Sequence, residues 1–162
     1  MLEHDNYFKE MLESQGFQVV AVDLEPHHPD ILKADITSLP FPDNAFDLVT
    51  CLEVIEHLDN EKMLLAIREL ERVTKKYIII SIPNREIPLG VGHKQFFDDK
   101  KLKNLFKCKN VEIYYFGKRL AYQGIRRYLC QKNQRLLCLH NKIFGEKKEE
   151  IDNWVLGIFQ LE

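Results

Sequence analysis

Short apolar runs that alternate with amphipathic segments constrain the fold of this chain more than any other feature. The strongest run covers residues 77–82 (YIIISI), and similar runs cover residues 17–23, 46–52 and 154–161. Nearly continuous apolar runs of this length are typical of strands that are buried on both faces of a sheet. The alternation therefore predicts an α/β fold, in which helices cover the faces of a sheet.

The segments between these runs have helical spacing or turn composition. We expect a helix over residues 60–73, because Asp59 can cap it and Met63, Ile67, Leu70 and Val73 would share one face. Gly16 is expected to end a helix at its C-terminal cap. The predicted helices are 5–15, 60–73, 98–107 and 119–144, and the shorter predicted strands are 31–34 and 111–116. The predicted loops are 24–30, 39–44 and 84–95. Pro83 is expected to end the strand 77–82.

The chain has 162 residues, which suits a single domain over residues 1–162. No apolar run approaches the roughly 20 residues that span a bilayer, and no basic start followed by an apolar stretch indicates a secretory signal. The four cysteines contain no CxxC pair and are expected to be reduced, mostly buried thiols. These features predict a cytoplasmic protein with no membrane span.

The net charge is only −2, but the charges are unevenly distributed. Residues 118–148 carry nine Lys and Arg and one acid, a composition that could face phosphates. The same segment contains several leucines that need a core, so a covering helical segment with a basic face is favoured over a nucleic-acid surface.

An acid at the end of a strand marks a candidate binding site. Ligands of open α/β sheets bind at the carboxyl ends of the strands, where a carboxylate such as Asp23 can accept both hydroxyls of a ribose. Asp23 could equally cap a loop. A metal site built from His27, His28 and Asp30 is not expected, because adjacent histidines diverge and no second ligand cluster has suitable spacing.

The ordered set of motifs is more specific than any single acid. The sequence reads VVAVDLEP, then ADITSLPFPDNAFDLVTCLEVIEHL, then YIIISIPN, and then a histidine followed by two phenylalanines. This set resembles the class I S-adenosylmethionine (SAM)-dependent methyltransferases, in particular their small-molecule and ubiquinone-biosynthesis-like branch. The resemblance covers about residues 6–106. It implies a Rossmann-like, mostly parallel sheet with an antiparallel C-terminal strand, and SAM as the cofactor.

The resemblance also implies roles for single residues. Asp23 matches the acid that binds the ribose hydroxyls of SAM, and Leu24 matches the residue that packs on the adenine. Asp35 matches the acid that accepts from the adenine amino group, and Ile36 the neighbour that lines the adenine pocket.

A second group of residues matches the segment after the fourth strand of the family, near the methionine part of SAM and the acceptor: Cys51, Leu52 and Glu53. Glu56 and His57 match a recurrent Glu-His pair, for which support of a helix start is favoured over chemistry. His57 and His93 remain candidates for acid–base catalysis, although His93 could be an ordinary loop residue.

One family motif has no counterpart in this sequence. The glycine-rich GxGxG turn should lie near positions 2, 4 and 6, where the chain has Leu2, His4 and Asn6. Glycines there let the backbone approach the cofactor. We therefore expect an N-terminally incomplete domain without its first strand, weakened SAM binding, and either truncation, a re-paired sheet, or a partner chain or second copy that completes the sheet.

The sequence supports one leading function and two rivals. The leading prediction is a SAM-dependent methyltransferase that acts on a small-molecule, lipid or glycan-precursor acceptor. A non-catalytic methyltransferase-like module that binds a protein partner is the alternative. A Rossmann dehydrogenase fits less well, because the LPFPD and FDLV segments do not suit it and the same glycines are missing.

Overall fold

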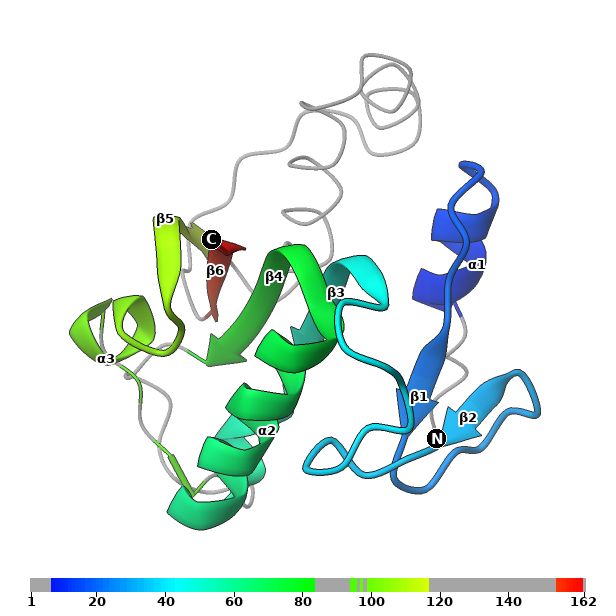
Figure 1. Ribbon diagram of the computed structural model, residues 1–162, viewed down its shortest axis with the longest axis horizontal. Coiled ribbons are helices and arrows are strands. Elements are labelled where there is room, and N and C mark those ends of the chain that lie inside the picture. The colour runs from blue at the N-terminus through cyan, green and yellow to red at the C-terminus, as the bar shows by residue number, and fades with distance from the viewer. Residues whose placement is uncertain (1–6, 84–93, 96, 98, 117–153, 162) are drawn as a thin grey trace. The chain divides into compact units, whose positions relative to one another are not determined.

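The computed structural model describes residues 7–83, 94, 95, 97, 99–116 and 154–161 (Figure 1). The chain divides into two compact units, the N-terminal unit Met1–Pro40 and the C-terminal unit Phe41–Glu162. Each unit has its own small sheet, and each is described separately below. The predicted helix 119–144, most of the predicted loop 84–95, and His93 lie outside the described residues.

The N-terminal unit contains one helix and two parallel strands. Helix α1 (Tyr7–Glu13) ends as predicted near Gly16, which has a φ of 86° and donates its amide to the Glu13 carbonyl at 2.8 Å. Strand β1 (Ala21–Asp23) pairs in parallel with β2 (Ile31–Lys33). The unit therefore has the α–β–β order that the sequence predicted.

The prediction of a buried strand over residues 17–23 is wrong in two respects. Only residues 21–23 form the strand, and the side chains of Phe17, Val20 and Val22 are exposed. The physical reason is that β1 has one described neighbour, β2, and no described strand precedes it to cover its other edge. A parallel strand becomes buried only when it is paired on both sides and covered on both faces.

The C-terminal unit is built on a four-stranded sheet with the order β3-β4-β6-β5. Strands β3 and β4 pair in parallel, whereas β6 pairs antiparallel with both β4 and β5. Three strands therefore point one way and the C-terminal strand points the other way, which confirms the predicted fold class. The strands are β3 (Phe46–Leu52), β4 (Thr74–Pro83), β5 (Cys108–Phe116) and β6 (Trp154–Leu161).

Strand β4 lies inside this sheet and supplies much of its core. Four of its isoleucines, Ile78, Ile79, Ile80 and Ile82, are at most 1% exposed, because the strand has a hydrogen-bonded neighbour on each side. It begins at Thr74, three residues earlier than predicted. The strand ends at Pro83, as predicted, and Pro83 lies opposite Trp154 of β6.

Helix α2 (Asn60–Val73) matches its prediction residue for residue and packs on β3 and β4 (Figure 1). The Asp59 side chain caps it by accepting the Lys62 amide at 2.9 Å. The apolar face predicted from the spacing is buried, namely Met63, Ile67, Leu70 and Val73, and Ala66 is buried with it. Capping and one apolar stripe thus suffice to fix both ends of this helix.

Helix α3 (Asp99–Lys103) is shorter than the predicted helix 98–107. After Lys103 the chain tightens into a turn, in which the Leu105 amide donates to the Leu102 carbonyl at 3.2 Å. The turn brings Phe106 against Phe159 of β6, with ring centroids 4.7 Å apart. Packing against the sheet therefore overrides the helical pattern at this point.

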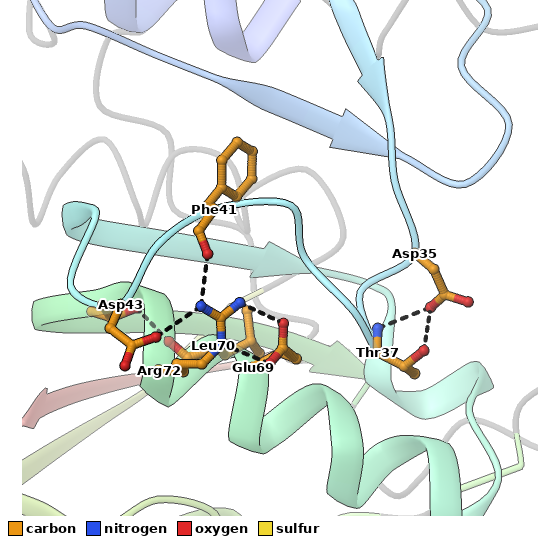
Figure 2. A network of polar contacts seen from close by, with 8 residues as sticks. Asp35, Thr37, Phe41, Asp43, Glu69, Leu70 and Arg72 are labelled. Carbon is orange, nitrogen blue, oxygen red and sulfur yellow. Dashed lines mark hydrogen bonds and ion pairs between the residues drawn. The ribbon is translucent and has the colours of Figure 1, made fainter.

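Arg72 of α2 binds the segment before β3 through hydrogen bonds (Figure 2). The guanidinium donates to the Phe41 carbonyl at 2.6 Å, to Asp43 at 3.0 Å and to Glu69 at 2.7 and 2.8 Å. The Arg72 carbonyl in turn accepts the amide of Asn44, whose φ of 54° places it at a tight turn. The LPFPDNAFDLV block thus has a clear structural role in the C-terminal unit.

Among the residues that the structure describes, no helix has the length and apolar character needed to cross a bilayer. The same residues include no group of three or more His, Cys, Asp or Glu arranged to hold a metal ion. Cys51 and Cys108 are free thiols.

Candidate cofactor site and a buried carboxyl pair

Asp23 and Asp35 lie at the same edge of the N-terminal sheet. Asp23 is the last residue of β1 and is in register with Lys33, the last residue of β2. The Asp23 carbonyl accepts the amide of Ala34 at 2.9 Å, so the parallel pairing extends to the residue before Asp35. The topology therefore brings the two predicted acids to neighbouring carboxyl ends of parallel strands.

Each of these carboxylates is oriented by its own loop. The Glu25 amide donates to Asp23 Oδ1 at 2.7 Å. The Thr37 amide and hydroxyl both donate to Asp35 Oδ1, at 2.9 and 2.7 Å (Figure 2). Such contacts two residues ahead are typical of Asx turns, and they fix the direction of an exposed side chain before any ligand binds.

The two residues predicted to contact an adenine follow these acids directly. Leu24 is 60% exposed, and Ile36 is half-buried. An exposed leucine next to a strand-end carboxylate gives this edge of the unit both an apolar and an acidic surface. That combination is what a nucleoside needs, with an apolar contact for the base and acceptors for the hydroxyls.

The other predicted residues lie at the carboxyl end of β3, in the C-terminal unit. Cys51 is buried, and Leu52 and Glu53 are half-buried. Glu53 has a φ of 58°, which is uncommon for a residue other than glycine, and its amide donates to the Ser81 carbonyl at 3.1 Å. This conformation turns the chain away from β3 while keeping Glu53 beside β4.

Glu53 forms a buried pair with Glu56. Ser81 Oγ donates to Glu53 Oε1 at 2.5 Å, and the negative charge of Glu56 acts on Glu53. Burial raises the pKa of Glu53 to about 8. The hydrogen bond from Ser81 lowers this pKa, and repulsion from Glu56 raises it further. Burial likewise raises the pKa of Glu56 to about 7. Burial raises the pKa of the Cys51 thiol above its usual range, and the charges of the two glutamates add to this rise.

His57 lies at the rim of this pair rather than within it. Its Nε2 is 3.9 Å from Glu56 Oε1, and its side chain is 44% exposed, compared with 1% for Glu56. Residues Ile55–His57 form a short 3-10 turn before α2. The Glu56 carbonyl accepts the amides of Lys94 and Gln95 at 2.7 and 3.0 Å. The backbone of Glu56 therefore holds residues 94 and 95 beside this turn, and the predicted support of the helix start remains a prediction.

Sequence reasoning named Glu53 but missed its partnership with Glu56 and Ser81. Glu56 lies three residues from Glu53, a spacing that occurs in many exposed helical turns. Ser81 is one small residue within an apolar strand. No signal in the sequence shows that all three side chains meet in a buried place.

Part of this chain is similar in sequence to known proteins. Residues 5–80 match the sequence family described as "Methyltransferase domain". An uncharacterized protein of Methanocaldococcus jannaschii is 43% identical over 80 residues, which cover 49% of this chain and 34% of that protein. The aligned part of the chain thus spans about a third of the length of this curated relative.

Two solved structures are similar over most of the chain. A SAM-dependent methyltransferase from Archaeoglobus fulgidus has a TM-score of 0.65 at 19% identity, covering 94% of this chain and 80% of that one. A SAM-dependent methyltransferase from Thermotoga maritima has a TM-score of 0.52 at 20% identity, covering 82% of this chain and 64% of that one. At these identities the similarity concerns the fold.

Proposed function

From the class I methyltransferase fold of this chain, we propose that it binds SAM and transfers the methyl group to a small-molecule acceptor. The observation that carries this proposal is the placement of Asp23 and Asp35 at neighbouring carboxyl ends of the parallel strands β1 and β2. In α/β sheets that edge is where ligands bind. The match of residues 5–80 to a methyltransferase family supports the same function.

The residues at this edge fit the nucleoside part of SAM. Asp23 would accept the two ribose hydroxyls, and Asp35 would accept from the adenine amino group, because both are exposed carboxylates already oriented through Oδ1. Leu24 would pack on the adenine and Ile36 would line its pocket. When bound, SAM supplies a methyl group activated by a sulfonium. The chain has only to hold cofactor and acceptor in line and provide a proton acceptor.

The open edge of β1 suggests a further strand in the working protein. Val22 and Leu24 of this segment and Leu32 of β2 are exposed, and β1 pairs only with β2 among the described strands. A strand from outside the described residues, including one from a partner chain or a second copy, would satisfy this edge. It would also cover apolar side chains that otherwise face water.

Calorimetric titration with SAM tests the cofactor proposal. We expect weak binding, near millimolar, because no glycine precedes Gly16. Asp23→Asn and Asp35→Asn should each weaken it by roughly ten- to a hundredfold, since a hydrogen bond to a charged group contributes about 1.5–3 kcal/mol. Asp30→Asn, an exposed acid of the same unit, is the matched control and should bind like the wild type.

Two results would contradict this reasoning in different ways. Equal affinities for wild type, Asp23→Asn and Asp35→Asn would remove the assignment of the nucleoside site. Micromolar binding by the wild type would instead show that the argument from the missing glycines is wrong.

A further inference from the structure

Three carboxylate oxygens of the C-terminal unit are buried without a hydrogen-bond donor among the described residues. They are Glu53 Oε2 and both side-chain oxygens of Glu56. Buried acceptors in folded proteins are nearly always paired, because an unpaired one loses its hydration without replacement. Among the described residues, packing therefore leaves a cluster of three such atoms unpaired.

These oxygens lie where a ligand would bind. Glu53 follows β3 and is hydrogen-bonded to Ser81, which lies two residues before the end of β4. The pair is thus at the carboxyl edge of two parallel strands, the edge that holds ligands in α/β folds. Glu53 as a whole is half-buried, whereas only 1% of the Glu56 side chain is exposed.

Within the described residues, no Lys or Arg forms an ion pair with either glutamate, and Lys94 approaches Glu56 through its backbone amide. His57 Nε2 lies 3.9 Å from Glu56 Oε1, and the His57 side chain is 44% exposed. Cys51, on the β3 side, is a buried thiol that would add negative charge if it ionised.

We propose that Glu53 and Glu56 bind the protonated amino group of the methyl acceptor and take up one of its protons. This role rests on the proposed methyltransferase function and names its acceptor class, an amine. A primary ammonium group carries three donors, which matches the three unpaired oxygens, and hydrogen bonds between charged groups are the strong ones. A hydroxyl acceptor carries a single donor and would leave two of the oxygens unpaired.

The proton balance of the step is complete. The ammonium gives one proton to the carboxylate pair, which exposes the nitrogen lone pair. Bound SAM would supply the methyl group, so that a nitrogen–carbon bond would form as the carbon–sulfur bond breaks, and the product would leave as a secondary ammonium. The pair then returns its proton to solvent. Because burial raises the pKa of both glutamates toward that of an amine, they accept this proton more readily than ordinary carboxylates would.

The test uses the full chain with carbon-13 in the glutamate carboxyl groups, observed by NMR. Ethylammonium chloride is the probe. It should shift the Glu53 and Glu56 resonances, lower the apparent pKa of the pair, and bind about tenfold or more weaker in Glu56→Gln. Glu61→Gln, an exposed acid in the first turn of α2, should bind the probe like the wild type.

Three further probes distinguish amine binding from general attraction of cations and from binding of uncharged molecules. Ethanol, which has no charge, and tetramethylammonium, which has no donor, should leave both resonances in place. The proposal would be overturned if tetramethylammonium shifted the resonances as much as ethylammonium does, or if magnesium shifted them more. It would also be overturned if the pair titrated but ethylammonium shifted neither resonance. The wild-type titration alone gives this answer if Glu56→Gln does not fold.

Parallel SAM titration separates this proposal from the function on which it rests. Binding of SAM without a response to ethylammonium would overturn the amine site and leave the methyltransferase. A response to ethylammonium in a chain that does not bind SAM would support the amine site and overturn the methyl-transfer function.

Discussion

The buried glutamate pair predicts an unusual dependence of stability on pH. Burial raises the pKa of Glu56 from its ordinary value of 4.5 to about 7, and that of Glu53 to about 8. Between pH 4.5 and these values, the folded chain holds protons that the unfolded chain releases. The stability linked to this protonation is therefore fully present below pH 4.5 and is lost as the pH rises through 7 to 8.

The size of the loss follows from the pKa of Glu56. A pKa that differs by one between the folded and unfolded chain corresponds to about 1.4 kcal/mol, so a rise from 4.5 to about 7 amounts to roughly 3 kcal/mol. Because the two carboxyls titrate as a coupled pair, the raised pKa of Glu53 adds to this loss in the same direction. It is a large fraction of the 5–15 kcal/mol by which typical domains are stable.

Urea unfolding followed by circular dichroism, at fixed pH values from about 5 to 9, measures this effect directly. The free energy of unfolding of the wild type should fall by at least about 3 kcal/mol across this range. Glu56→Gln keeps the size of the side chain but cannot ionise, so the part of the decline that belongs to Glu56 should disappear, whereas the part caused by burial of Glu53 should remain. Glu61→Gln should retain the whole decline. A decline of equal size in Glu56→Gln would refute the assignment of the buried charge.

Three other substitutions should lower the free energy of unfolding, and urea midpoints measure each of them. Asp59→Ala removes the cap on the Lys62 amide and should cost about 1 kcal/mol, whereas an unchanged midpoint would mean that the helix start does not depend on it. Gly157→Ala places a Cβ 2.7 Å from the ring of Phe159 and should cost about 1–3 kcal/mol, unless the ring moves freely. Arg72→Ala should lower the urea midpoint, because it removes the hydrogen bond to the Phe41 carbonyl and the ion pair with Asp43, and a loss that vanishes in high salt would show that charge alone matters.

Strain at Glu53 is consistent with a functional edge of the sheet. Residues other than glycine with positive φ cluster at binding and catalytic sites, where the surroundings hold them in place. Here Ser81 holds Glu53 at both its backbone amide and its side chain. The same two contacts keep the carboxylate beside Glu56, so the local conformation and the pairing of the acids are linked.

The sequence by itself determined the elements whose signals are local. Helix α2 could be predicted to the residue, because a cap at Asp59 and an apolar stripe both depend on neighbours within a few positions. The α/β class and the strand-end position of Asp23 and Asp35 followed from the alternation of apolar runs and from where those runs stop, whereas the antiparallel C-terminal strand was implied by the resemblance to class I methyltransferases.

Tertiary structure decided the features that depend on which segments lie side by side. Residues 17–20 have the pattern of a buried strand, yet they lie outside β1, because burial of a strand requires neighbours on both edges and β1 has one among the described strands. Pro83 stays in the sheet because β6 lies opposite it. Glu53 and Glu56 become a proton-binding pair only because the sheet and the turn before α2 bury them together, and burial is a property of the surroundings rather than of the residue.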